Sequence, residues 1–238
     1  MTLHIFHADP HILVLAKPSG LLAVPGRGPD KQDCLSRRVQ ARYPDALIVH
    51  RLDMDTSGLF LMARGPEAQR RLSMAFADRR VHKRYIAVVA GRLIPPATPD
   101  GWDLIDLPLM VDWPNRPRSI VDHARGKPSR TRWRVLSDQP PCSRGEGRDA
   151  GRDQHDRHNP AKDTTVPTTR LELEPLTGRS HQLRVHLQAL GHPILGDPLY
   201  APPAVFSQAE RLLLHASRLA FPHPVTGADL QFESPPDF

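Results

Sequence analysis

The chain has 238 residues, which is enough for one large domain or two small ones with a substantial core. Its net charge of +6 and its 32 Lys and Arg residues favour a polyanionic partner such as nucleic acid, although an ordinary basic enzyme has a similar charge. Two cysteines and no long apolar run argue against a disulfide framework, a cysteine-rich zinc site or a membrane span, and predict a soluble cytoplasmic protein.

The N-terminal part of the chain predicts a hairpin followed by a helix. Residues 3–7 and 12–16 have the short apolar pattern of two strands, with a turn between them. A helix is expected over residues 33–43, with Asp33 as its N-cap and Pro44 just after its end.

The next segment predicts two buried strands around a polar cluster. Residues 46–49 and 59–63 are strongly apolar, whereas residues 50–58 read His-Arg-Leu-Asp-Met-Asp-Thr-Ser-Gly. Two carboxylates and an arginine between buried strands are costly unless each charge has a partner. Asp53 is therefore a candidate nucleophile or base, although a lone Asp at a strand end is more often a turn or cap residue.

The central part of the chain predicts a helix and then several strands. A helix with an apolar face should begin at Pro66, and residues 84–90 indicate another buried strand. Residues 104–118 are expected to be irregular or to form short strands. Residues 130–136 and 169–173 alternate, as paired strands of a half-exposed sheet do.

The remaining segments predict a loop and two helices. Residues 137–168 contain almost no large apolar side chain, which predicts a disordered loop inserted in a hairpin. A third helix is expected over residues 180–190, capped by Ser180 and closed by Gly191. A short helix around 208–218 and a last strand complete an α+β fold, in which a largely antiparallel sheet is flanked by helices.

Two further clusters carry polar residues next to apolar ones. Arg184 lies beside Leu183 and Leu187 on the third predicted helix, so either it is buried with a carboxylate partner or its stem lies along the surface. Asp53 is a natural partner for it. Tyr85 follows Lys83 and Arg84, and it is either a core residue or a stacking surface for a nucleobase with cations nearby for phosphates.

These clusters together resemble the motifs of the RluA-type pseudouridine synthases. The resemblance begins at residues 17–21 (Lys-Pro-Ser-Gly-Leu), extends to 212–216 and excludes the predicted insert. The segments that carry it in between are 50–58, 83–85, 177–186 and 191–197. It implies a single pseudouridine synthase catalytic domain over 1–238, without the S4-like domain that some relatives have ahead of it.

The resemblance also implies a substrate. Residues 112–117 and 126–128 are similar to the branch that acts on both tRNA and 23S rRNA, with uridine 32 of tRNA and uridine 746 of the rRNA as usual targets. Because the base only changes its point of attachment, no cofactor and no metal are implied. A monomer without an obligatory protein partner is expected.

By the same resemblance, Asp53 is the catalytic carboxylate, Arg184 its paired cation and Tyr85 the ring that stacks on uracil. Asp53 either attacks the nucleoside covalently or takes a proton from C2′, and both routes stay open. Arg51 would fill the space that the flipped uridine leaves. The other residues implied in binding RNA or substrate are His50, Lys83, Arg84 and Leu183; further candidates for phosphate contacts are Arg79, Arg80, Arg116 and Arg118.

Two alternatives compete with this hypothesis. Asp53-Met54-Asp55 is similar to the Asp-x-Asp signature of aspartate-nucleophile phosphotransferases, but His50 and Arg51 stand where that family has an apolar strand, and no adjacent Asp-Asp pair follows for Mg²⁺. The other alternative is a catalytically silent RNA-binding protein.

Overall fold

The computed structural model describes residues 3–139 and 166–238. Its first half contains β1 (Ile5–Ala8), β2 (Ile12–Lys17), α1 (Leu35–Gln40), β3 (Ala46–Ile48), β4 (Ser57–Arg64), α2 (Pro66–Ala77), β5 (His82–Ala90), β6 (Asp103–Asp106), β7 (Leu109–Val111) and β8 (Ser119–Val121). Its second half contains β9 (Arg130–Gln139), β10 (Thr168–Pro175), α3 (Gln182–Ala189), α4 (Pro203–Phe206), β11 (Leu214–Pro222) and β12 (Asp229–Glu233).

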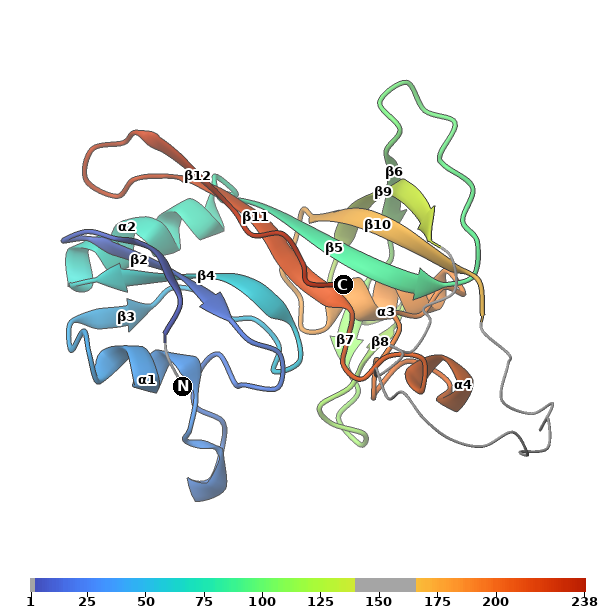
Figure 1. The fold of residues 1–238 in the computed structure, drawn as a ribbon, viewed down its shortest axis with the longest axis horizontal. Coiled ribbons are helices and arrows are strands. Elements are labelled where there is room, and N and C mark those ends of the chain that lie inside the picture. The colour runs from blue at the N-terminus through green and yellow to red at the C-terminus, as the bar shows by residue number, and fades with distance from the viewer. Residues whose placement is uncertain (1–2, 140–165) are drawn as a thin grey trace, which may run out of the picture.

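A ten-stranded sheet runs through the described part of the chain (Figure 1). Its main path is β1-β2-β4-β11-β5-β10-β9-β6, with β3 added on β4 and β12 on β11, while β7 and β8 form a separate pair. Among the described strands, β4 and β11 pair in parallel and the other neighbours are antiparallel. Figure 1 shows α1 and α2 at one end of the sheet and α3 and α4 at the other. This arrangement confirms the predicted α+β class.

Gly58 allows the parallel contact that joins the two ends of the sheet. It lies opposite Ala216 of β11 and has φ 110, a conformation that side chains with a Cβ rarely adopt. A Cβ at this position would lie 2.3 Å from the Ala216 carbonyl oxygen. The glycine of the polar cluster is therefore required where β4 begins, immediately after the loop that carries Asp53.

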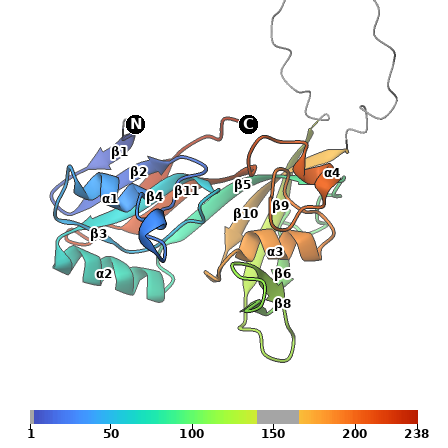
Figure 2. The ribbon, with the colours of Figure 1, turned by 90° about the horizontal axis from the view of Figure 1, so that it is seen from below.

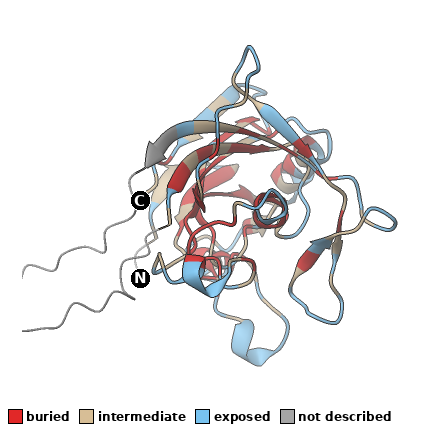
Figure 3. Ribbon diagram, turned by 90° about the vertical axis from the view of Figure 1, so that its right-hand side faces the viewer, coloured by how far each residue is buried: buried red, intermediate tan, exposed pale blue. Residues whose placement is uncertain are grey.

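The strands of the sheet centre are buried on both faces because helices cover each side. On one face Leu13, Leu15 and Phe60 share a core with α1 and α3, and on the other Ile12 and Leu61 share a core with α2. These alternating sets follow from the two-residue period of a strand. Figure 3 shows the buried stretches along the strands and the exposed ones in the surrounding loops. No helix in the described ranges is long and apolar enough to cross a membrane.

Two predicted helices begin later than expected. α1 begins at Leu35 with Cys34 as N-cap, because Asp33 forms an ion pair with Arg38 instead of capping the helix. α3 begins at Gln182 and its N-cap is His181 rather than Ser180. Its C-terminal end at Gly191 is as predicted, whereas the first turn uses the Gln182 side chain to accept the Arg179 amide.

The predicted helix over 208–218 is wrong. Leu214 starts β11, which pairs with β4 and β5, so the apolar run belongs to a buried strand. A short run of apolar residues does not distinguish a strand from a helix by its period. The ends of the predicted insert are also strands, since Thr168 pairs with Gln139. Residues 140–165, the rest of that insert, lie outside the described residues.

Candidate active site

A cleft of about 830 Å³ lies against the central strands of the sheet, at the start of β5. The loop after β3, the C-terminal end of α2, the start of β5 and the connection from β10 to α3 form its walls. Seven of the eight site residues predicted from the sequence line it: His50, Arg51, Asp53, Lys83, Tyr85, Leu183 and Arg184. The fold therefore gathers at one place residues that are far apart in the chain.

Asp53 is half-buried in this cleft, with 22% of its side chain exposed. Its Oδ2 lies 3.9 Å from Nη1 of Arg184, and its Oδ1 lies 3.9 Å from Nε2 of His181. Both distances are too long for a hydrogen bond. The carboxylate thus faces two nitrogen atoms without being bonded to either, and it is accessible from the cleft.

Arg184 is buried, as one of the two readings of its spacing predicted, but its main partner is not Asp53. Its Nε and Nη2 donate to the Asp197 carboxylate at 2.7 and 2.5 Å, and the two side chains are 2% and 0% exposed. Burial opposes the charged form of Arg184, but the Asp197 carboxylate outweighs it and raises the pKa. The expected pairing with Asp53 is corrected to a longer contact made by the remaining nitrogen.

Asp197 is fixed to the backbone as well as to Arg184. Its Oδ1 accepts the amides of Leu199 and Tyr200. A buried carboxylate with this many donors is held in one position. Asp197 therefore orients the guanidinium that faces Asp53.

Tyr85 lines the cleft. The alternation of β5 places Lys83 and Tyr85 in the cleft wall, and Leu183 of α3 lines the same space. Burial and the nearby Asp53 charge raise the pKa of Tyr85 far above its ordinary value, so its phenol stays protonated near neutral pH. Burial lowers the pKa of Lys83.

Arg84 does not line the cleft. The same alternation turns it to the other side of β5, where its guanidinium lies 3.2 Å from Glu174 and 4.3 Å from the Trp102 ring centroid. Its contact with RNA stays a prediction.

His50 supports the loop that carries Asp53. Its Nε2 accepts the Leu61 amide at 2.9 Å, and its ring packs on Phe60 and Phe76. Burial and the Lys83 charge lower the pKa of His50 to about 3, so the ring is neutral near neutral pH. Its contact with RNA stays a prediction, as does that of Arg51, which is exposed at the edge of the cleft.

Lys17, the first residue of the segment where the family resemblance begins, was not among the predicted site residues. It is 1% exposed, and its Nζ donates to the carbonyls of Pro18, Leu21 and Met54 at 2.8, 2.6 and 2.6 Å. Burial lowers the pKa of Lys17 to about 8, against the attraction of Asp55 and Asp53. Because Met54 follows Asp53, this lysine fixes the loop from below.

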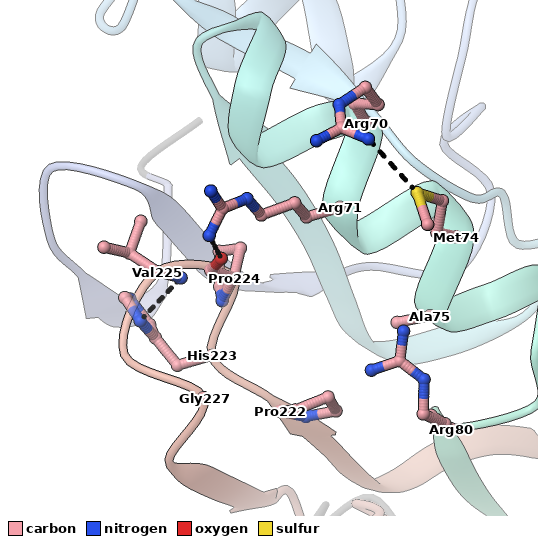
Figure 4. Close-up of a pocket in the computed structure, with 10 residues that line it drawn as sticks. All are labelled: Arg70, Arg71, Met74, Ala75, Arg80, Pro222, His223, Pro224, Val225 and Gly227. Carbon is pink, nitrogen blue, oxygen red and sulfur yellow. Dashed lines mark hydrogen bonds between the residues drawn. The ribbon is translucent and has the colours of Figure 1, made fainter.

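The other predicted phosphate contacts lie in different places. Arg79 is exposed and lines the cleft, whereas Arg118 lies over the Tyr200 ring and Arg116 over Trp113. Arg80 lines a smaller pocket of about 250 Å³ between α2 and the turn after β11. Figure 4 shows the arginines of this pocket around its opening, where Arg71 reaches the Pro224 carbonyl.

No group of His, Cys, Asp and Glu side chains suited to a metal ion occurs in residues 3–139 and 166–238. The side-chain nitrogen atoms near the Asp53 carboxylate belong to Arg184 and His181.

The sequence matches a known protein family. The model of the family described as RNA pseudouridylate synthase matches residues 11–189. The chain belongs to this family. Its fold and its activity as a pseudouridine synthase, an isomerase that acts on RNA, are thereby confirmed over the phosphotransferase and the silent RNA-binding protein.

Relatives of this pseudouridine synthase match over most of its length. It is 44% identical to the dual-specificity RNA pseudouridine synthase RluA of Escherichia coli K12, over 98% of this chain and 93% of that protein. The RluA of Yersinia pestis is also 44% identical, over 98% of this chain and 99% of its own length. The solved structure of human RNA pseudouridylate synthase domain containing 1 has 26% identity and a TM-score of 0.73, covering 100% of this chain and 84% of that one.

Proposed function

We propose that this enzyme isomerises uridine to pseudouridine in both tRNA and 23S rRNA, at uridine 32 and uridine 746 respectively. The 44% identity to relatives named dual-specificity synthases supports two substrates. Residues 112–117 and 126–128, which resemble the same branch, support these targets. A cytoplasmic monomer stays a prediction.

The mechanism rests on the accessibility of the Asp53 carboxylate. Within the described residues its carboxylate has only the two contacts at 3.9 Å, while the cleft gives it access to a substrate. The reaction breaks the N1–C1′ bond, forms a C5–C1′ bond and moves a proton from C5 to N1. Attack by the carboxylate and removal of the C2′ proton both require Asp53 to be ionised.

Tyr85 and Arg51 supply what a flipped uridine needs. Taking a base out of its stack costs a few kcal/mol, and stacking on one aromatic ring returns about 1–3 kcal/mol. The Tyr85 ring lies in the cleft wall near Asp53, while exposed Arg51 lies two residues before it. Arg51 then fills the vacated space, and the protonated Tyr85 acts as a stacking surface.

Replacing Asp53 by Asn tests this function directly. The change removes the ionised carboxylate but keeps its shape, so we expect the rate to fall by about 1,000-fold or more. The assay is pseudouridine formation at saturating unmodified tRNA transcript, together with RNA binding, which should be retained. Asp55→Asn, two residues along the same loop and outside the cleft lining, is the matched control and should keep its activity.

Substrate choice needs a separate measurement. Pseudouridine mapping of tRNA and 23S rRNA from cells with and without this protein should show the loss of both target sites. Loss at one site only would reduce the proposal to a single substrate, and turnover by the Asp53→Asn enzyme would contradict the mechanism.

A further inference from the structure

A chain of buried polar groups leads from β8 to Asp53. The Ser119 amide donates to the Tyr200 hydroxyl at 2.8 Å, and this hydroxyl lies 2.7 Å from Nδ1 of His181. Nε2 of His181 in turn lies 3.9 Å from Oδ1 of Asp53. Tyr200 is 4% exposed and the His181 side chain 10%. Figure 2 shows β8 beside α3, the helix that follows His181.

These contacts determine which nitrogen of His181 carries its proton. The Tyr200 oxygen already accepts the Ser119 amide, so its own hydrogen is best donated to Nδ1. The opposite tautomer would leave that buried hydroxyl hydrogen without an acceptor and would aim a nitrogen lone pair at the Asp53 carboxylate. A neutral His181 therefore carries its hydrogen on Nε2, which faces Asp53.

The carboxylate of Asp53 thus has one donor aimed at each oxygen. Nη1 of Arg184 faces Oδ2 and Nε2 of His181 faces Oδ1, both at 3.9 Å. Hydrogen bonds of catalytic groups are often long in the absence of substrate and shorten in the complex. We propose that His181 is a positioning residue that donates its Nε2 hydrogen to Asp53 during the reaction, and that Tyr200 sets the tautomer which makes this possible.

The surroundings of His181 keep it neutral. Burial lowers its pKa, the Asp53 charge opposes this, and the Arg184 charge adds to it. The charged or titratable groups that face the imidazole are Asp53, Arg51, Arg184, Asp197 and Tyr200. A neutral ring donates a hydrogen bond to the carboxylate without holding a charge that would compete with Arg184.

The backbone of His181 and the ring of Tyr200 are also held in fixed positions. His181 has φ 55, in the left-handed region that few residues other than glycine adopt. Tyr200 is anchored by its amide to Asp197, and the Arg184 and Arg118 guanidinium groups lie 5.0 and 5.4 Å from its ring centroid. The pair is therefore held rigidly between the structural partner of Arg184 and the proposed catalytic carboxylate.

The first test removes one oxygen atom. Tyr200→Phe keeps the ring between its arginines but frees the His181 tautomer, and we expect the single-turnover rate at saturating tRNA transcript to fall about 10-fold, with RNA affinity unchanged. Tyr43→Phe is the matched control, because the Tyr43 ring contacts Arg42 and Arg64 away from the cleft. It should keep the full rate.

The second test separates the imidazole from the backbone conformation. His181→Asn retains a residue that tolerates positive φ but cannot reach Asp53, and we expect a loss of about 10- to 100-fold. His181→Gln, whose amide nitrogen lies near the position of Nε2, should restore part of the rate. The double variant Tyr200→Phe/His181→Asn should be no slower than His181→Asn alone, because both changes break one chain.

The pH profile distinguishes positioning from a structural role. In His181→Asn the acid limb of the rate profile should move to higher pH, because Asp53 has lost a donor; a change that only destabilised the fold would lower the melting temperature without moving this limb. Unchanged rates and profiles in folded Tyr200→Phe and His181→Asn would overturn the proposal, as would additive losses in the double variant.

This inference rests on the proposed role of Asp53, but the two fail differently. Turnover by the Asp53→Asn enzyme would remove the proposed function itself. An inactive Asp53→Asn enzyme together with fully active His181 and Tyr200 variants would remove only the proposed roles of His181 and Tyr200.

Discussion

Two clusters of arginine, carboxylate and aromatic side chains lie on the two sides of β5. One surrounds Asp53 in the cleft, and the other meets the cleft lining only at Glu174. On the outer side, Glu174 is 3.2 Å from both Arg84 and Arg132, and Glu172 is 2.6 Å from Arg134. The same three guanidinium groups lie 4.3–5.0 Å from the Trp102 ring centroid.

The cleft cluster has the same kinds of side chain, but its acid and its ring have fewer close partners. Arg184 and Asp197 form a bidentate pair, but Asp53 has contacts at 3.9 Å and the Tyr85 ring lines open space. In the outer cluster each acid and the aromatic ring already have partners. The two clusters therefore differ less in composition than in availability. In the cleft, the Asp53 carboxylate and the Tyr85 ring are accessible to a ligand.

Removing an acid from each cluster should have the largest effect on stability. Asp197→Asn leaves the Arg184 charge buried without its carboxylate, and we expect the free energy of unfolding to fall by about 3–5 kcal/mol. Glu174→Gln removes a partner of two arginines that are 25% and 34% exposed, and should cost about 1 kcal/mol or less. Urea unfolding measures both, and equal losses would contradict the distinction.

Replacing an arginine in each cluster should separate their effects on the rate. Arg184→Lys keeps the charge but cannot bind Asp197 with two parallel bonds while also facing Asp53, so we expect about a 100-fold slower reaction. Arg84→Lys should leave the rate nearly unchanged, because Arg84 does not line the cleft. Single-turnover assays at saturating RNA would show this, and a similar loss in both variants would place the outer cluster in catalysis.

The histidine under the cleft should make the fold sensitive to acid. The pKa of His50 is lowered to about 3 in the folded state, whereas the unfolded chain takes up this proton near its ordinary value. The stability that neutral His50 contributes is therefore fully present above its pKa in the unfolded chain. It is lost as the pH falls towards the pKa of His50 in the folded state. We expect the free energy of unfolding to fall by about 2 kcal/mol from this residue between neutral pH and about pH 4.5.

His50→Gln is the variant that isolates this effect. Its amide oxygen can still accept the Leu61 amide, but it does not titrate. The variant should lose less stability on acidification than the native chain does. Parallel pH dependence of the two proteins would show that other groups account for the acid sensitivity.

The sequence predicted the strands that carry the site better than the contacts within it. The apolar runs at β2, β4 and β5 are long enough and buried enough to be recognised by their pattern. Burial was one of the two interpretations that the place of Arg184 beside an apolar helix face allowed. Its partner Asp197 could not be found this way, because it lies in a connection without any periodicity, 13 residues further on.

The residues that were missed act through long-range contacts. Lys17 could not be recognised as a support of the Asp53 loop, because one of its three acceptors is a carbonyl 37 residues away. The link from Tyr200 to His181 depends on how α3 and β8 meet, which no local pattern contains. Arg84 was grouped with Tyr85 although strand alternation places neighbouring residues on opposite faces.

The smallest expected effect concerns the aromatic rings of the two clusters. Tyr85→Phe keeps a ring for stacking and removes a hydroxyl whose raised pKa keeps it protonated, so we expect the rate to fall by about 10-fold or less. Trp102→Phe changes the ring that the outer arginines cover, and should lower stability without changing the rate. Single-turnover rates and urea unfolding of both variants give the comparison.

A loss for Tyr85→Phe as large as that for Asp53→Asn would contradict the stacking role. It would show that the hydroxyl itself takes part in moving a proton, although burial and the Asp53 charge hold it in the protonated form. Tyr85→Leu decides between these roles, because it removes both the ring and the hydroxyl. If stacking matters most, the Leu variant should be clearly slower than the Phe variant, since about 1–3 kcal/mol of base stacking is lost with the ring.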